Sequence, residues 1–447
     1  MIAGEVDDRD DHKPPRLRGL IIGDPGGIRT HDRWLKRPLL YQAELPSHVS
    51  PSGCRTEHSS ESDTILAERV SLIKMRIAML GCKGVPATMA YGGGVERHVE
   101  QLAPRLVALG HDVTVYVRPY TNPRRRKTWN GCKLVTIPAV RQKHVETMTH
   151  VFLSTIHAVR QHYDVIHYHG VGPSTLAWIA RLFAPRAKVI VTFHSRDRFH
   201  EKWNVIGRAY LAWGEWTAVK FPHATIAVSH VIQRFCRRMY GTSTDFIPNG
   251  IEPPRANIAT DEIERMGLRP NGYFLGLGRL VPHKAFDVAL GAFLTVPTAL
   301  DFAIVGDPGY DERYAERLYA MAERDSRVKM LGFRTGRELE QLLAHCYALI
   351  HPSRSEGLSV AVLEAMSHGK VVIMSNIPEN LELVDHSGIA FPVDDVGRLR
   401  DTLAWLSEDP EILRERGQRA RRMVVRDYNW DSIALRTDIV YRRVAGV

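Results

Sequence analysis

From Met75 onward, short apolar runs alternate with segments of helical periodicity, and this order constrains the fold more than any other feature of the chain. The first apolar run covers residues 76–80, a helix-like segment follows at 95–109, and a second run covers residues 111–117. Strands that are joined through helices in this way form parallel sheets buried on both faces. The chain is therefore predicted to contain a doubly wound α/β domain. Pro104 should kink the 95–109 helix or end it early.

The alternation starts again in the second half of the chain. The first series continues with runs at 165–168, 188–193 and 225–229, and the second series has runs at 273–278, 301–306, 328–332, 347–351 and 371–374. We predict two Rossmann-like domains, residues 75–250 and 251–429, joined near Ile247-Pro-Asn-Gly-Ile251. Ligands bind at the carboxyl ends of such sheets, so the two domains should face each other across a cleft. Residues 430–447 should form a helix that crosses back toward the first domain.

Charge is unevenly distributed along the 447 residues. Residues 75–250 hold 24 basic and 9 acidic groups, and the densest basic run is Arg124-Arg-Arg-Lys127. Such a block favours an acidic partner, which is a nucleic acid, an anionic lipid or a phosphorylated substrate. The five cysteines lack metal-ligand spacing, and reduced thiols in a cytoplasmic protein explain them best. Residues 1–74 show no sustained helix or strand period, and we expect a disordered leader or a mis-assigned start that precedes the true start at Met75.

Two glutamates point to the chemistry. Glu356 and Glu364 are eight residues apart in an apolar segment, so we expect both carboxylates on one face of one helix. The Gly357 turn should open this helix, where backbone N–H groups and the helix dipole favour an anion. Carboxylates that accept sugar hydroxyls beside a phosphate pocket predict a nucleotide sugar as ligand. Taken alone, the pair also fits a solvated surface helix.

A basic motif precedes this helix. Arg279 and Lys284 follow the first strand of the second domain directly, in Gly278-Arg-Leu-Val-Pro-His-Lys284. A planar guanidinium and an ammonium group could together neutralise a diphosphate leaving group.

With these motifs the chain resembles the retaining nucleotide-sugar glycosyltransferases of the GT-B fold, family 4. The resemblance runs from Met75 to the C-terminus and rests on Gly278-Arg-x4-Lys284, Ile247-Pro-Asn-Gly250, Val305-Gly-Asp307 and Glu356-x7-Glu364. The N-terminal half is more similar still to bacterial rhamnosyltransferases of capsule and exopolysaccharide pathways. This likeness rests on Gly81-Cys-Lys-Gly-Val-Pro86, Tyr91-Gly-Gly-Gly-Val-Glu96, His167-Tyr-His-Gly-Val-Gly-Pro173 and Lys202-Trp203.

The resemblance implies a role for each matching residue. Arg279 and Lys284 would hold the donor diphosphate, Glu364 the ribose hydroxyls and Glu356 the hydroxyls of the donor sugar. Backbone amides of Gly357, Leu358 and Ser359 would face a phosphate, and Gly92, Gly93 and Gly94 would let a loop approach the phosphates closely. His194 would lie over the donor sugar, so His194 and Glu356 are the catalytic candidates. His167, His169 and Asp197, expected at strand ends facing the cleft, are acceptor-side candidates.

The implied reaction transfers a sugar to an acceptor hydroxyl with retention, in bacterial surface polysaccharide synthesis. Neither a metal nor another cofactor is expected, because cationic groups stabilise the leaving diphosphate. The acceptor would be a lipid-linked or oligosaccharide substrate at the inner face of the plasma membrane. There the Arg124-Arg-Arg-Lys127 run and a helix with Trp213, Trp216 and Lys220 could meet an anionic surface.

Three other functions were weighed. A nicotinamide-dependent oxidoreductase needs Gly-x-Gly-x-x-Gly after its first strand, and Gly81-Cys-Lys-Gly84 lacks that spacing. A nucleic-acid-binding protein would interleave aromatic and basic residues, whereas the basic groups here are dispersed, so no nucleic-acid partner is expected. The alternatives that stay open are a sugar-nucleotide epimerase of the same fold and a non-catalytic protein that binds nucleic acid or an anionic surface.

Overall fold

The computed structural model describes residues 73–87, 92–140, 142, 145–199, 203–309 and 311–447. The chain divides into two units, residues 1–39 and 40–447, and every described residue belongs to the second unit. The expectation of a leader over residues 1–74 falls almost entirely outside the described residues. Among the described residues, no helix is both long and apolar enough to cross a membrane.

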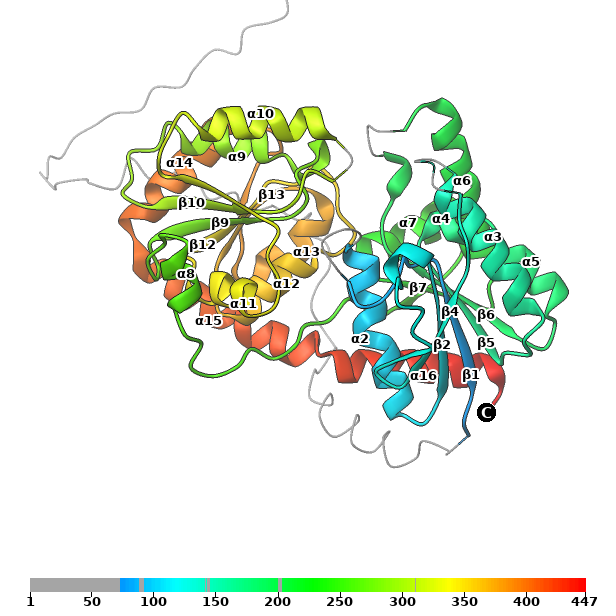
Figure 1. Cartoon of the computed structure of the whole chain (residues 1–447). Coiled ribbons are helices and arrows are strands. Elements are labelled where there is room, and N and C mark those ends of the chain that lie inside the picture. The colour runs from blue at the N-terminus through cyan, green and yellow to red at the C-terminus, as the bar shows by residue number, and fades with distance from the viewer. Residues whose placement is uncertain (1–72, 88–91, 141, 143–144, 200–202, 310) are drawn as a thin grey trace, which may run out of the picture. The chain divides into compact units, whose positions relative to one another are not determined.

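Two parallel sheets organise the described residues, as the alternating sequence predicted (Figure 1). The first sheet has the order β3-β4-β2-β1-β5-β6-β7-β8, and all of its pairings are parallel except that of β3 with β4. Its strands are β1 (Arg76–Leu80), β2 (Asp112–Val117), β3 (Thr128–Trp129), β4 (Cys132–Thr136), β5 (Val165–His169), β6 (Lys188–Phe193), β7 (Ala224–Ala227) and β8 (Asp245–Phe246).

Helices cover both faces of this first sheet. Alternate residues of β1 point to opposite sides, so Ile77 and Met79 pack with α2 and α16 while Ala78 and Leu80 pack in the core on the other face. The helices of the domain are α2 (Gly94–Ala108), α3 (Glu146–Val159), α4 (Val171–Ser174), α5 (Ala177–Phe183), α6 (Val205–Lys220) and α7 (His230–Tyr240), with short 3-10 turns η1 (Pro119–Thr121) and η2 (Asp197–Phe199). Helix α2 runs through Pro104, so the early break that proline suggested does not occur.

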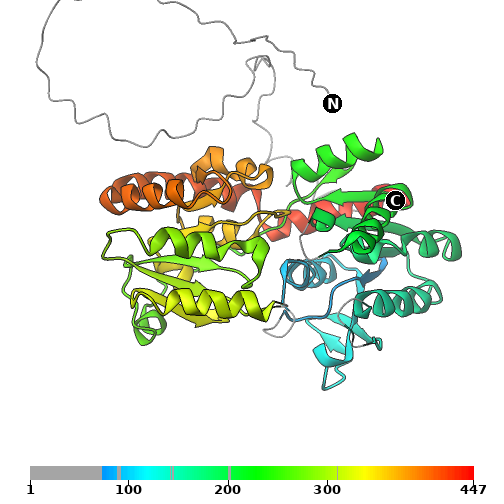
Figure 2. The same ribbon diagram turned by 90° about the horizontal axis from the view of Figure 1, so that it is seen from above.

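The second sheet is fully parallel, with the order β11-β10-β9-β12-β13-β14. Its strands are β9 (Tyr273–Leu277), β10 (Asp301–Val305), β11 (Val328–Gly332), β12 (Ala348–His351), β13 (Val372–Ser375) and β14 (Ile389–Phe391). Figure 2 shows helices on both of its faces. They are α8 (Asp261–Arg265), α9 (Phe286–Phe293), α10 (Glu312–Ala322), α11 (Gly336–His345), α12 (Val360–Ser367), α13 (Pro378–Ser387), α14 (Val396–Glu408) and α15 (Pro410–Asp427), with the 3-10 turn η3 (Pro282–Lys284).

The C-terminal helix α16 (Trp430–Ala445) packs within the core of the first domain. Trp430, Ile433 and Tyr441 are buried with β1 and α2 (Figure 1). A polar chain inside this contact runs from the Met75 amide to His111 Nδ1 (3.2 Å), and from His111 Nε2 to Asp438 (2.8 Å). The two segments that link the domains touch each other, because the Ile251 amide donates to the Tyr428 carbonyl at 2.7 Å.

Candidate active site

A pocket of about 560 Å³ collects residues from the carboxyl ends of both sheets. Nearly all of the residues singled out in the sequence line it: Gly92, Gly93, Gly94, His169, His194, Asp197, Arg279, Lys284, Glu356, Gly357, Leu358, Ser359 and Glu364. The strand order explains this convergence, because every parallel strand delivers its following loop to the same edge of its sheet.

Glu356 does not lie on the helix that carries Glu364, and that part of the sequence prediction is wrong. Helix α12 begins at Val360 with Ser359 as its N-cap, so Glu356 belongs to the loop that follows β12. The expectation of phosphate-facing amides shifts accordingly. The unpaired amides of the first helical turn belong to residues that include Val360 and Ala361, and both line the pocket.

Glu356 forms a nearly buried ion pair at the centre of the pocket. Its Oε1 lies 2.5 Å from Lys284 Nζ and 3.1 Å from His351 Nε2. Burial alone would raise the pKa of Glu356, but the positive charge of Lys284 and the contact with His351 hold this pKa well below its ordinary value. Glu356 is therefore a carboxylate at neutral pH, and Lys284 is fixed beside it.

Glu364 has a different electrostatic environment. Burial raises its pKa, the Arg97 guanidinium lowers it, and the neighbouring Glu100 raises it again. Arg97 Nη2 lies 3.8 Å from the Glu364 carboxylate, and Arg97 also donates to Glu100 at 3.0 Å. The second carboxylate of the sequence motif thus faces a cation from α2 of the first domain.

The loops after β9 and β10 are packed tightly where they enter the pocket. A Cβ on Gly306 would lie 1.8 Å from the Gly278 carbonyl oxygen, so only glycine fits at that crossing. This contact fixes the backbone ahead of Arg279. Arg279 lines the pocket and forms no salt bridge with the described residues. Phe333, which follows β11, lines the same pocket and presents an aromatic surface.

A second close approach joins the two domains. A Cβ on Gly357 would lie 1.7 Å from the His194 carbonyl oxygen, so the loop carrying Glu356 rests directly on the end of β6. Asn249 reinforces this contact. Its Nδ2 donates to the Leu358 carbonyl at 2.9 Å, and its Oδ1 lies 3.0 Å from His98 Nδ1. Since that oxygen can only accept, His98 carries its proton on Nδ1.

Histidines cluster on the first-domain side of the pocket. The rings of His98 and His194 meet edge to face with their centroids 4.7 Å apart, and His169 Nδ1 lies 3.4 Å from His194 Nε2. Burial lowers the pKa of His98 to about 4 and holds the pKa of His169 and of His194 well below the ordinary value. These imidazoles are neutral at pH 7, so they act as hydrogen-bonding groups rather than as cations.

His167 is the one predicted site residue that the structure moves away from the cleft. Its Nδ1 lies 2.6 Å from the Tyr441 hydroxyl and its Nε2 lies 2.7 Å from Thr192 Oγ1. The side chain is fully buried, and α16 covers it. Both ring nitrogens are therefore used within the core, and His167 is not available to an acceptor.

Two features bear on acceptor binding and on metals. Asp197 lines the pocket and accepts a hydrogen bond from Ser195 Oγ at 2.5 Å. His98, His169 and His194 each offer one ring nitrogen, and these nitrogens lie within 4.8 Å of one another, so a transition metal could be held there. Among the described residues, no other group of three such ligands forms.

The arrangement separates two chemical tasks. Arg279, Lys284 and the start of α12 supply positive potential, which suits a diphosphate whose charge grows as a bond breaks. Glu356 and Glu364 supply acceptors for hydroxyl groups. Neutral imidazoles and Asp197 of the first domain line the same pocket.

Sequence reasoning missed His98, Arg97 and Asn249 as members of the site. Arg97 and His98 lie one turn into α2, just after the glycine loop, and Arg97 reaches Glu364 of the second domain while His98 contacts Asn249. The glycine motif could have signalled them, because a helix that starts at a pocket places its first residues there. Asn249 was noted only as part of the linker sequence.

Comparison with known proteins shows that the chain is similar to glycosyltransferases. Residues 92–255 match the family described as Glycosyltransferase Family 4, and residues 264–423 match the family described as Glycosyl transferases group 1. The phosphatidyl-myo-inositol mannosyltransferase of Mycolicibacterium smegmatis is 26% identical over 83% of this chain and 95% of its own length. The UDP-Gal:alpha-D-GlcNAc-diphosphoundecaprenol alpha-1,3-galactosyltransferase of Escherichia coli is 26% identical over 60% of this chain and 73% of its own length.

Solved structures show the same fold. Sucrose-phosphate synthase from Thermosynechococcus elongatus aligns with a TM-score of 0.73 at 20% identity, over 83% of this chain and all of that chain. HepE of Anabaena, in a complex with UDP and glucose, aligns with a TM-score of 0.69 at 20% identity over the same shares. The sequence prediction of two Rossmann-like domains in a GT-B arrangement is confirmed. On this fold, a segment that matches Glycosyltransferase Family 4 is followed by a segment that matches Glycosyl transferases group 1.

Proposed function

We propose that this glycosyltransferase moves a sugar from a nucleotide-diphosphate donor to a hydroxyl of a lipid-linked saccharide, with retention, in bacterial surface polysaccharide synthesis. The observation that carries the donor side is the joint placement of Arg279, Lys284, Glu356 and Glu364 in one pocket. Relatives whose names specify a phosphatidylinositol or a diphosphoundecaprenol acceptor support the acceptor class.

Each donor-side residue has a proposed task. Arg279 and Lys284 hold the diphosphate, and the start of α12 adds unpaired amides for one of its phosphates. Glu364 accepts the ribose hydroxyls. Glu356, kept ionised by Lys284, accepts hydroxyls of the sugar near its anomeric carbon.

The reaction we propose exchanges one bond at the anomeric carbon for another. The bond to the diphosphate oxygen breaks while the acceptor oxygen attacks on the same face, and the leaving phosphate takes the acceptor proton. The positive wall stabilises the departing charge, so no metal ion is assigned a role. His194 lines the same pocket as Glu356, where a neutral imidazole can donate to a sugar hydroxyl.

The donor sugar we propose is a hexose or rhamnose, and the N-terminal motifs resemble those of rhamnosyltransferases. The relatives found are named as mannosyl-, galactosyl- and N-acetylglucosaminyltransferases, so these sugars form the comparison panel. We place the enzyme on the cytoplasmic side of the plasma membrane, where a lipid-linked acceptor meets its soluble donor.

Calorimetry of the full chain against uridine, guanosine and thymidine diphosphates tests the donor assignment, followed by transfer assays with rhamnose, mannose, galactose and N-acetylglucosamine donors. Binding of one nucleotide that weakens strongly in Arg279→Ala is expected. Binding that is equal in Arg279→Ala and in the exposed control Arg400→Ala would sink the donor site. Interconversion of a sugar nucleotide without transfer would favour an epimerase instead.

A further inference from the structure

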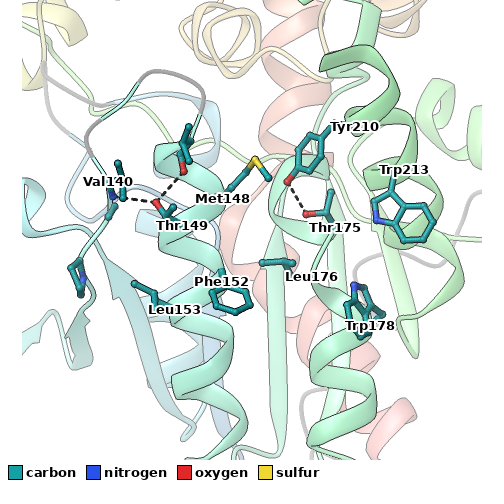
Figure 3. A pocket seen from close by; sticks show the side chains of 13 residues that line it. Val140, Met148, Thr149, Phe152, Leu153, Thr175, Leu176, Trp178, Tyr210 and Trp213 are labelled. Atoms are coloured by element: carbon teal, nitrogen blue, oxygen red, sulfur yellow. Dashed lines mark hydrogen bonds between the residues drawn. The ribbon is translucent and has the colours of Figure 1, made fainter. Parts of the chain in front are cut away.

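A second hollow of about 810 Å³ lies in the first domain, and its lining is almost entirely apolar. Three parts of the chain form it: the loop after β4, the first turns of α3, and residues of α5 and α6 with the segment before α5. We call it the apolar groove, and its lining residues are Pro138, Ala139, Val140, Val145, Met148, Thr149, Phe152, Leu153, Thr175, Leu176, Trp178, Tyr210 and Trp213. Figure 3 shows Met148, Phe152 and Leu176 lying between Val140 on one side and Trp213 on the other.

Among the described residues, several side chains that line the groove are exposed and no part of the chain fills it. Val140 is 55% exposed, Trp213 49% and Phe152 47%. Clusters of large exposed apolar side chains are uncommon on soluble proteins and mark binding surfaces. Such a surface would lose unfavourable contact with water if an apolar ligand covered it.

The hydroxyl groups of the lining already form hydrogen bonds within the chain. Thr149 Oγ1 accepts from the Val140 amide at 3.1 Å and donates to the Val145 carbonyl at 3.0 Å. Thr175 Oγ1 lies 2.8 Å from the Tyr210 hydroxyl, as the dashed lines in Figure 3 mark. Binding sites for polar molecules present a few convergent donors and acceptors. The other polar side-chain groups of the lining are the indole N–H groups of Trp178 and Trp213, and the remaining side chains are apolar, so the chemistry of the groove favours a hydrocarbon.

The groove and the active site stand back to back. Thr147 lines the active-site pocket, and the next two residues of α3 line the groove. Near α4, Pro173 lines the active-site pocket while Thr175 and Leu176 line the groove. One turn of α3 together with α4 therefore separates the two spaces.

Cations lie on the active-site side of this partition. Arg118 lines the pocket, donates to Thr147 Oγ1 at 3.0 Å and pairs with Glu146 at 2.9 Å. Lys83 lines the pocket as well. A molecule with a hydrocarbon chain in the groove and a phosphate beside these two cations would have its next group inside the pocket.

We propose that the apolar groove binds the hydrocarbon chain of the lipid phosphate that carries the acceptor sugar. The chain lies along α3, α5 and α6, and the phosphate passes over the partition toward Lys83 and Arg118. This inference rests on the proposed lipid-linked acceptor, and it adds where that lipid is held. The order of apolar, cationic and catalytic surfaces matches the order of chain, phosphate and sugar in such a molecule.

Titration calorimetry with monomeric decyl phosphate and ethyl phosphate tests the groove without any sugar transfer. Decyl phosphate should bind the wild-type chain at least about 100-fold more tightly than ethyl phosphate, because several methylenes are buried. The Met148→Gln/Phe152→Gln variant should lose at least about tenfold of the decyl phosphate affinity and keep the ethyl phosphate affinity. Both side chains are partly exposed, so the fold should tolerate the change, and thermal unfolding checks this.

The matched control is Leu182→Gln, which alters a 64% exposed side chain of α5 outside the groove and should leave decyl phosphate binding unchanged. Lys83→Gln should weaken decyl phosphate but not decanol. Equal loss of decyl phosphate affinity in the groove variant and in the control would overturn the proposal. So would unchanged binding of the monomer combined with weaker pelleting on phosphatidylglycerol vesicles, because the surface would then contact a bilayer rather than hold one chain.

The same experiment separates this inference from the proposed function. If the chain binds decyl phosphate in the groove but transfers no sugar, the groove proposal stands and the assignment of glycosyl transfer fails. A chain that transfers sugar to a water-soluble acceptor, with no advantage for a long alkyl chain in wild type, would keep the transferase and remove the groove.

Discussion

Replacing Lys284 by methionine should damage stability and catalysis for two separate reasons. The lysine ammonium lies 2.5 Å from Glu356, and the two side chains are only 15% and 12% exposed. Removing one member of a buried pair leaves an uncompensated charge, which typically costs about 3–5 kcal/mol. For a domain of this size we expect the melting temperature Tm of the second domain to fall by about 6–20 °C.

A second substitution separates the two effects. Adding Glu356→Gln to Lys284→Met removes the stranded charge, so most of the lost Tm should return, while transfer stays at least about 100-fold below wild type. The matched control is Lys133→Met, whose 2.6 Å partner is Asp112 but whose side chain is 59% exposed. An exposed pair contributes about 0–1 kcal/mol, so this variant should melt close to wild type.

The pH dependence of the same comparison follows from the direction of the Glu356 shift. The pKa of Glu356 lies below its ordinary value of 4.5 in the folded protein, so the pair stabilises the fold fully above that pH and less as the pH falls through the folded pKa. In Lys284→Met the main lowering charge is gone and burial raises this pKa. The Tm difference between wild type and variant should therefore be largest at pH 7 and shrink toward pH 4.

Calorimetric scans and a donor-turnover assay measure both effects. If the Tm losses of the single variants Lys284→Met and Glu356→Gln add up to the loss of the double variant, Lys284 and Glu356 are not coupled. The electrostatic reasoning would then be refuted. Normal turnover in Lys284→Met would instead refute the assignment of this residue to the donor diphosphate.

Three further predictions concern the rest of the site. Gly357→Ala should lower kcat/KM by at least about 100-fold, because its Cβ would meet the His194 carbonyl and shift the catalytic loop. The control Gly291→Ala, whose Cβ would lie 3.6 Å from Val396, should turn over normally. Equal kinetics in the two variants would show that the close approach is unimportant. Glu364→Gln should raise KM for the donor about 10–100-fold with little change in kcat. Because burial raises the pKa of Glu364, acidification should begin to weaken wild-type donor binding at a pH above the ordinary carboxyl range. A donor affinity that is independent of pH from pH 7 to pH 4 would contradict this. Transfer should persist after dialysis against EDTA, as measured by donor consumption, and a loss that Mg²⁺ or Mn²⁺ restores would require a metal role.

Much of the fold could be read from the chain because strand periodicity and helix periodicity agree with burial. Residues of β9 illustrate this, since Phe274 packs on one face and Tyr273 and Leu275 on the other. Both faces are covered, so the strand is an uninterrupted apolar run that is visible in the sequence. The break expected at Pro104 failed because a proline can be accommodated within a helix when packing on either side holds it.

Most of the residues that line the pocket were also foreseeable, because they follow a strand or lie near the start of a helix. The loop position of Glu356 could not be predicted, because the sequence does not fix the residue at which a helix begins. Helix α12 begins at Val360, four residues after Glu356. His167 shows a further limit. His167 and His169 lie on the same face of β5, but His167 is in the middle of the strand, where α16, which follows more than 250 residues later, covers it. Local pattern carries no information about such a distant partner.

The return of α16 to the first domain also changes how the polypeptide can be divided. The second domain is, in topological terms, an insertion between two pieces of the first, entering after Gly250 and leaving before Trp430. The two segments that link the domains pack against each other, and a Cβ on Gly250 would lie 2.7 Å from the Trp430 ring. A fragment ending at residue 250 would lack part of its own core, whereas the excised middle segment keeps all six strands of its sheet. Any rotation between the domains must bend both crossings at once, which favours a single axis over free swivelling.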